Sequence, residues 1–271
     1  MQTHYVRAHD GTQLYWTEWG SGPPILFSNS AGMPTEMWDY QMGALADHGF
    51  RCIAFDRRGH GRSDVPPRGY DFDTFADDMA ALIQALDLKQ LTLIAHSMGG
   101  GEVVRYLTRH GNQRVSRIVL IGSTTPFQLQ AADNPNGIPA ANFEALRASW
   151  RKDYPRWIAE NTAPFFVPET SPAMARWLSG LLMRFPARIA VALNEAIASA
   201  DFRRELPRIS VPALVIHGDR DVSAPLALTG KPTAELIPGC RFKVYEGAPH
   251  GLLYTHMDRL HADILEFIAE T

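Results

Sequence analysis

Short, almost continuous apolar runs alternate with longer amphipathic stretches along most of the chain. The apolar runs that predict strands lie at residues 25–28, 51–56, 91–95, 117–122, 213–218 and 242–246. Amphipathic helices are predicted at about 36–48, 72–86, 102–109 and 258–268. Strands without polar alternation are typical of parallel sheets that are covered on both faces. The pattern therefore predicts an α/β fold with a mainly parallel sheet flanked by helices.

The chain starts with a different pattern. Residues 4–7 and 13–18 alternate between polar and apolar side chains, and Asp10-Gly11 lies between them. An Asp-Gly pair between alternating segments predicts a β-hairpin.

A second change of pattern lies between Gly122 and Pro212. Residues 133–139 are rich in turn formers, and helices are then predicted near 142–161, 172–183 and 187–199 with no strand between them. We expect a helical cap inserted into the core, which divides the chain into core residues 1–123, cap residues 124–206 and core residues 207–271.

The predicted cap is rich in large apolar side chains. Packing onto the core is the ordinary role of any one of them. Together, above the carboxyl edge of the sheet, they would line a mostly apolar pocket, and we expect Trp150, Trp157 and Phe165 to contact a substrate there.

Composition narrows the functional classes. The chain has 271 residues, 45% of them hydrophobic, and a net charge of −3, so it has the material for a large core and no basic footprint for nucleic acid. Residues 1–10 have no apolar signal region, and no apolar run reaches the length of a membrane span. We therefore expect a cytoplasmic protein that binds neither nucleic acid nor membrane.

The cysteines are too few for a disulfide framework. There are two, Cys52 in an apolar strand-like run and Cys240 in a loop, and neither has a second cysteine nearby. We expect a buried thiol and a half-exposed thiol, with no metal site and no cofactor.

Ser97 stands between a predicted strand and a predicted helix. It follows the run 91–96 and precedes three glycines at 99–101. Such a sharp turn exposes a hydroxyl beside the free N–H groups of a helix N-terminus. The pattern is that of the nucleophile elbow G-x-S-x-G, with Ala95 in place of the first glycine. An ordinary serine at a helix N-cap is the alternative at this point.

A serine nucleophile needs an imidazole and a carboxylate. Of ten histidines, His250 follows the last predicted strand in a loop of small residues. Asp221 and Asp219 both follow the strand at 213–218, at the same predicted sheet edge. We favour Asp221 as the acid and expect Asp219 to brace the turn through backbone N–H groups.

Five other histidines receive structural interpretations. We expect His96 to line the elbow and His60 to brace its own loop. We expect His217 to be hydrogen-bonded inside a strand, and His256 and His261 to belong to the final helix.

The motifs resemble those of the α/β-hydrolase superfamily, and within it the cofactor-free haloperoxidase, perhydrolase and aryl esterase group. The resemblance covers almost the whole chain and is most specific at residues 55–64, 95–103, 215–221 and 243–251. It implies an eight-stranded sheet, with Ser97 as nucleophile, Asp221 as acid and His250 as base.

One segment departs from that group, which usually has His-Gly-Trp after the strand that ends at Ser28. This chain has Asn29-Ser30-Ala31-Gly32, which is similar to the enol-lactonases of aromatic catabolism. Either relative implies that the backbone N–H groups of Ala31 and Met98 form the oxyanion hole. We also expect Asn29 to contact the substrate.

These observations predict a serine hydrolase that cleaves small, largely apolar esters or lactones through an acyl-enzyme. A perhydrolase that uses hydrogen peroxide in place of water is one alternative. A non-catalytic ligand-binding module on the same fold is another. The sequence leaves open whether the protein is a homo-oligomer.

Overall fold

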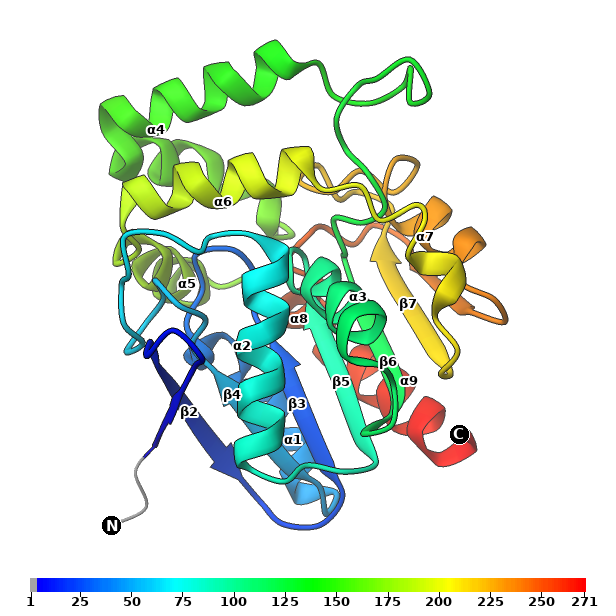
Figure 1. The fold of residues 1–271 in the computed structure, drawn as a ribbon. Coiled ribbons are helices and arrows are strands. Elements are labelled where there is room, and N and C mark those ends of the chain that lie inside the picture. The colour runs from blue at the N-terminus through cyan, green and yellow to red at the C-terminus, as the bar shows by residue number, and fades with distance from the viewer. Residues whose placement is uncertain (1–3) are drawn as a thin grey trace.

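A computed structural model describes residues 4–271, and in that range the strands form one sheet (Figure 1). The strand order is β1-β2-β4-β3-β5-β6-β7-β8, and β3 to β8 are parallel. The strands are β1 (Tyr5–Arg7), β2 (Gln13–Trp19), β3 (Pro24–Ser28), β4 (Arg51–Phe55), β5 (Leu91–His96), β6 (Val115–Ile121), β7 (Ala213–Gly218) and β8 (Arg241–Tyr245). The predicted fold class and the predicted hairpin of β1 and β2 are confirmed.

Helices cover both faces of the sheet, with α2 and α3 in front of it in Figure 1 and α1 and α9 behind it. The α-helices are α1 (Asp39–Asp47), α2 (Phe72–Ala85), α3 (Gly99–His110), α4 (Ala140–Asn161), α5 (Pro172–Met183), α6 (Ala187–Ser199), α7 (Gly230–Leu236), α8 (Leu252–Thr255) and α9 (Met257–Glu270). Short 3₁₀ helices occupy Thr35–Trp38, Ala163–Phe165 and Leu206–Arg208. None of these helices is long and apolar enough to cross a bilayer.

The apolar strands are explained by two cores, one on each face of the sheet. In β5, Leu93 and Ala95 belong to the cluster formed with α2 and α3, whereas Ile94 belongs to the cluster formed with α1 and α9. Successive side chains of a strand point to opposite faces, so a sheet buried on both faces needs apolar residues at every position.

Some elements differ from the sequence prediction. A 3₁₀ helix at Thr35–Trp38 replaces the first turn of the helix predicted at 36–48. The elbow helix α3 begins at Gly99, three residues before the predicted start. The short helices α7 and α8 were not predicted, because α7 carries Pro232 in its first turn and α8 is a single turn without a periodic pattern.

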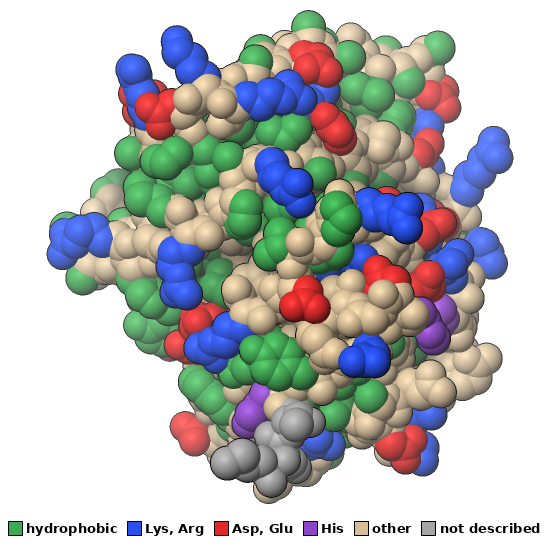
Figure 2. Space-filling model, turned by 60° about the vertical axis from the view of Figure 1, so that its left-hand side comes forward, with side chains coloured by type: hydrophobic (Ala, Val, Ile, Leu, Met, Phe, Trp, Pro, Cys, Tyr) green, Lys and Arg blue, Asp and Glu red, His purple; other side chains and the backbone are tan. Residues whose placement is uncertain are grey.

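The segment between β6 and β7 carries α4, α5 and α6, which lie beyond the carboxyl ends of the parallel strands (Figure 1). Helix α4 is broken at Asp153, two residues before Pro155. Hydrophobic side chains gather over this part of the molecule, in the upper half of Figure 2. The division of the chain at 123/124 and 206/207 stays a prediction.

Candidate active site

Ser97 occupies a strained turn between β5 and α3. Its φ is +57°, a left-handed conformation that is rare for a residue with a side chain, and it is 8% exposed. The following glycines allow the turn to pack closely, because a Cβ at Gly99 would lie 2.5 Å from the carbonyl oxygen of Ser28 and one at Gly100 would collide with the Ser123 hydroxyl. The strain is therefore at the serine itself, and the glycines make room for its neighbours.

Asp221 and His250 meet at the carboxyl edge of the sheet. His250 lies in the loop between β8 and α8, and its Nδ1 donates to Asp221 Oδ2 at 2.6 Å. The other carboxylate oxygen of Asp221 accepts from the N–H groups of Ser223 and Ala224. An ionised Asp221 fixes the proton on Nδ1 of His250, which leaves Nε2 free to accept a proton.

Several groups act on the pKa of Asp221. Burial alone would raise it, but the charge of His250 and hydrogen bonds from His217 and His250 hold the pKa of this carboxyl well below its usual range. His217 Nε2 lies 3.3 Å from Asp221 Oδ2 and 2.7 Å from the carbonyl oxygen of Ala224. Asp221 is therefore held ionised between two histidines.

Asp219 has a different position from Asp221. Its Oδ1 accepts from the N–H of Gly247 at 2.7 Å, three residues before His250 in the chain. This is the turn-bracing position expected for Asp219, and the carboxylate that contacts the imidazole is that of Asp221.

The segment after β3 presents Ala31 to the same cavity as Ser97 and His250. Met98 follows the nucleophile and its side chain is fully buried. Among residues 4–271, neither the N–H of Ala31 nor that of Met98 has an acceptor in the protein. Two free backbone donors therefore flank the serine.

The prediction that Asn29 contacts substrate needs correction. Asn29 is 1% exposed and is absent from the cavity wall. Its Nδ2 donates to the carbonyl oxygens of Met33 and Phe55, and its Oδ1 accepts from Trp38 Nε1. A buried amide whose donors and acceptor are all used this way shapes the loop from below.

A buried ion pair also supports this loop. Arg57 and Glu102 are 1% and 0% exposed, and Arg57 Nε donates to Glu102 Oε2 at 3.0 Å. Arg57 Nη2 also donates to the carbonyl oxygen of Asn29, and the Ser28 hydroxyl donates to Glu102. This ion pair was not predicted from the sequence. An acidic residue in the first turn of the elbow helix is a signal that could have identified Glu102.

His96 joins the loop after β3 to the loop that carries His250. Its Nε2 lies 2.9 Å from the carbonyl oxygen of His250, so Nε2 is the donor and Nδ1 accepts from the hydroxyl of Ser30. Burial, with the nearby charge of His250, lowers the pKa of His96 to about 3. The sequence predicted only that His96 lines the turn, and it did not predict this bridge.

His60 braces its own loop, as expected, and also the loop after β3. Its Nε2 accepts from the N–H of Gly32 at 3.1 Å, and its Nδ1 donates to the carbonyl oxygen of Arg58. Burial and the charge of Arg57 lower the pKa of His60 to about 3, so the ring is neutral.

A cavity of about 470 Å³ lies between the sheet edge and the cap. Ser97 and His250 lie in its wall together with the predicted residues Trp150, Trp157 and Phe165. Most of the remaining wall is apolar, and the described lining includes no Lys, Arg, Asp or Glu. Within residues 4–271, no three His, Cys, Asp or Glu side chains are grouped to hold a metal ion.

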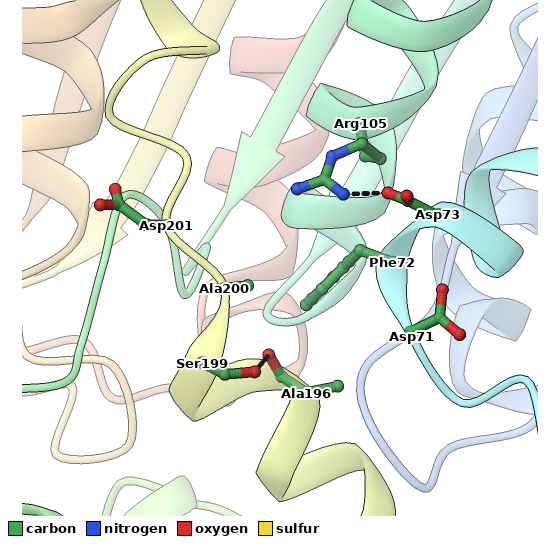
Figure 3. A pocket seen from close by; sticks show the side chains of 8 residues that line it. All are labelled: Asp71, Phe72, Asp73, Arg105, Ala196, Ser199, Ala200 and Asp201. Carbon is green, nitrogen blue, oxygen red and sulfur yellow. Dashed lines mark hydrogen bonds and ion pairs between the residues drawn. The ribbon is translucent and has the colours of Figure 1, made fainter.

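A second hollow, between α2, α3 and the end of α6, is polar (Figure 3). Arg105 pairs there with Asp73, and the Ser199 hydroxyl donates to carbonyl oxygens of its own helix. No histidine is among its lining residues, so the chemistry described above belongs to the cavity under the cap.

Comparisons with known proteins agree with this architecture. Residues 23–257 match a protein-family model whose description is alpha/beta hydrolase fold. A non-heme chloroperoxidase from Kitasatospora aureofaciens is 37% identical over 268 residues, covering 96% of this chain and 97% of the relative. An esterase from Exiguobacterium antarcticum has a similar structure, with a TM-score of 0.95, 30% identity and coverage of 99% and 100% of the two chains. An enol-lactonase from Burkholderia xenovorans superimposes with a TM-score of 0.86, at 26% identity and coverage of 98% and 99%. The chain therefore belongs to the α/β-hydrolase fold family, as its motifs predicted.

Proposed function

We propose that the protein hydrolyses carboxylic esters or lactones through an acyl-enzyme on Ser97. The observation that carries the proposal is that one cavity is lined by the strained Ser97 and by His250, whose imidazole is hydrogen-bonded to Asp221. The Ser97 oxygen attacks the carbonyl carbon while His250 Nε2 takes the hydroxyl proton. The tetrahedral intermediate then expels the alcohol, which receives that proton, and water repeats the sequence to release the acid.

The backbone N–H groups of Ala31 and Met98 hold the oxyanion in this mechanism. Neither N–H has an acceptor among the described residues, which supports the assignment, because free donors are required where negative charge develops. Each such donor contributes on the order of 3 kcal/mol to lowering the barrier.

The substrate proposed is a small, uncharged and largely apolar molecule. The described lining supports this because it is mostly apolar and includes no charged side chain, so a buried carboxylate or ammonium would have no partner there. The esterase and the enol-lactonase among the similar structures support ester and lactone chemistry. The cytoplasmic location expected from the sequence stays a prediction.

Perhydrolysis is the second candidate, because the chain is similar to a protein named as a chloroperoxidase. In that reaction hydrogen peroxide replaces water in the release of the acyl group and a peracid forms. The ratio of peracid to acid made from one ester, measured with both nucleophiles present, separates the two functions.

The test of the main proposal is the hydrolysis of 4-nitrophenyl butyrate by Ser97→Ala and His250→Ala. Each variant should lose nearly all activity, and the double variant should be little worse than either single one, since members of one catalytic unit are not additive. Ser179→Ala is the matched control, a cavity serine whose hydroxyl donates to the carbonyl oxygen of Ala175. More than a tenth of the activity in Ser97→Ala would contradict the serine mechanism.

A further inference from the structure

Two side chains of the cavity wall have buried donors without acceptors. Gln128 is 4% exposed, and its Nε2 has no partner within residues 4–271. The indole Nε1 of Trp150, on α4, is also buried without a partner. Both residues line the cavity that contains Ser97.

Asn194 adds a third donor, and Arg147 fixes its orientation. Arg147 Nη1 donates to Asn194 Oδ1 at 3.0 Å. A guanidinium group only donates, so the amide must present its oxygen to Arg147 and its NH₂ group elsewhere. Asn194 lines the cavity, and its NH₂ group has no acceptor among the described residues.

The donors of α4 and α6 lie on facing helices. Trp150 is one helical turn beyond Arg147 on α4, and Arg147 contacts Asn194 on α6. Arg147 itself is buried and paired with Glu144 and Glu195, so its charge is used within the cap. The cap thus contributes side chains with unused N–H groups to the cavity wall, and the described lining includes no cation.

A donor enclosed in an apolar cavity discriminates between ligands. A ligand oxygen restores its hydrogen bond, whereas a methylene group in the same place leaves the donor unpaired. Because the described wall has no charged residue, the matching acceptor is an uncharged oxygen. A ketone, an ether or a further ester group has this chemistry.

From these observations we infer that Gln128, Trp150 and Asn194, here called the cap donors, bind uncharged oxygen atoms of the substrate that are separate from the scissile ester. The inference rests on the proposed ester hydrolysis and specifies the class of ester. The preferred substrates carry a second acceptor oxygen in the part of the molecule that reaches the cap.

The test compares 4-nitrophenyl esters of straight-chain acids with matched esters in which one methylene is replaced by oxygen, at each chain position in turn. Alkyl acetates with the same replacements probe the alcohol side. The measured quantity is the ratio of kcat/KM for the oxygen-containing and the all-carbon ester. Dividing the ratio of the parent by that of each variant cancels the intrinsic reactivity of the esters.

Gln128→Met keeps the side-chain length and removes the donor. Asn194→Asp keeps an acceptor for Arg147 while it removes the NH₂ group, and Trp150→Phe removes the indole N–H. At one or more chain positions, the ratio of kcat/KM for the oxygen-containing ester to that for the all-carbon ester should be about tenfold higher in the parent than in a variant. A change of about tenfold corresponds to the loss of one well-formed hydrogen bond. Gln130→Met, at an exposed position outside the cavity wall, should leave the ratio unchanged.

Equal ratios in the parent and all three cap-donor variants, at every position of both series, would overturn the inference. Hydrolysis of the all-carbon esters is the independent readout of the proposed function. If the parent cleaves these esters and the ratios are equal, the inference alone fails. If the parent cleaves no ester in either series, the proposed function fails with it.

Discussion

Replacing His96 with phenylalanine should remove a buried bridge without creating a large cavity. The imidazole is 2% exposed, donates to the carbonyl oxygen of His250 and accepts from the Ser30 hydroxyl. Phenylalanine leaves both partners without a hydrogen bond, and each buried unpaired group costs about 1–3 kcal/mol. At pH 7 the free energy of unfolding should therefore fall by about 2–6 kcal/mol, and the loop of His250 should lose its support.

The pH dependence gives this prediction a specific sign. His96 has a pKa of about 3 in the folded protein. In the unfolded chain its pKa is about 6.5, so between these values the unfolded state binds the proton and the folded state does not. Proton binding to His96 in the unfolded chain consequently lowers the free energy of unfolding of the parent by about 2 kcal/mol at pH 5 and by almost nothing at pH 7. Phenylalanine does not titrate, so the variant lacks this contribution. The gap in stability between parent and variant should narrow by about that amount as the pH falls.

Urea denaturation of the parent and of His96→Phe at both pH values measures the gap, since the titration of groups that do not interact with residue 96 cancels in the difference. His48→Phe is the control, because His48 is an exposed residue at the end of α1. kcat/KM for an ester, measured at pH 7 on the same samples, should also fall for His96→Phe. A gap that is absent at pH 7, or that widens at pH 5, would refute the assignment of a neutral, doubly hydrogen-bonded His96.

Four further variants test other parts of the site. Asp221→Asn should reduce kcat/KM by about four orders of magnitude because the imidazole tautomer is lost, whereas Asp219→Ala should keep most activity and lower the melting temperature. Enzyme kinetics and thermal denaturation measure these effects, and the opposite ranking would reassign the acid. Ala31→Trp fills the cavity next to the proposed oxyanion site and keeps the backbone donor, so the preference for acetate over hexanoate esters should rise at least about tenfold. Unchanged selectivity would place Ala31 away from the acyl group. Glu102→Leu leaves the buried charge of Arg57 without its partner and should cost about 3–5 kcal/mol in a denaturant titration, and a loss below about 1 kcal/mol would contradict the importance of this pair.

The sequence predicted what local patterns encode. Apolar runs such as 91–95 and 213–218 predicted the parallel strands, because a sheet covered on both faces requires apolar residues at every strand position. Ser97, Asp221 and His250 were identifiable because each follows a strand, and the carboxyl ends of parallel strands lie at one edge.

The contacts that support the site could not be predicted in the same way. His96 and the carbonyl of His250 are 154 positions apart, and Arg57 and Glu102 are 45 positions apart. No local pattern encodes such pairings, since they depend on how separate loops meet above the sheet. Asn29 shows the same limit, because a polar residue at a loop start fits a binding role until its partners Phe55 and Trp38 are known.

The most direct test of the account is covalent labelling with a fluorophosphonate, followed by peptide mapping by mass spectrometry. We expect one adduct per chain in the parent, located on Ser97, and no adduct on this peptide in Ser97→Ala. Labelling of His250→Ala should be much slower, because the imidazole must take the hydroxyl proton. A parent that hydrolyses esters without labelling at Ser97, or a Ser97→Ala variant that labels as fast as the parent, would contradict the account.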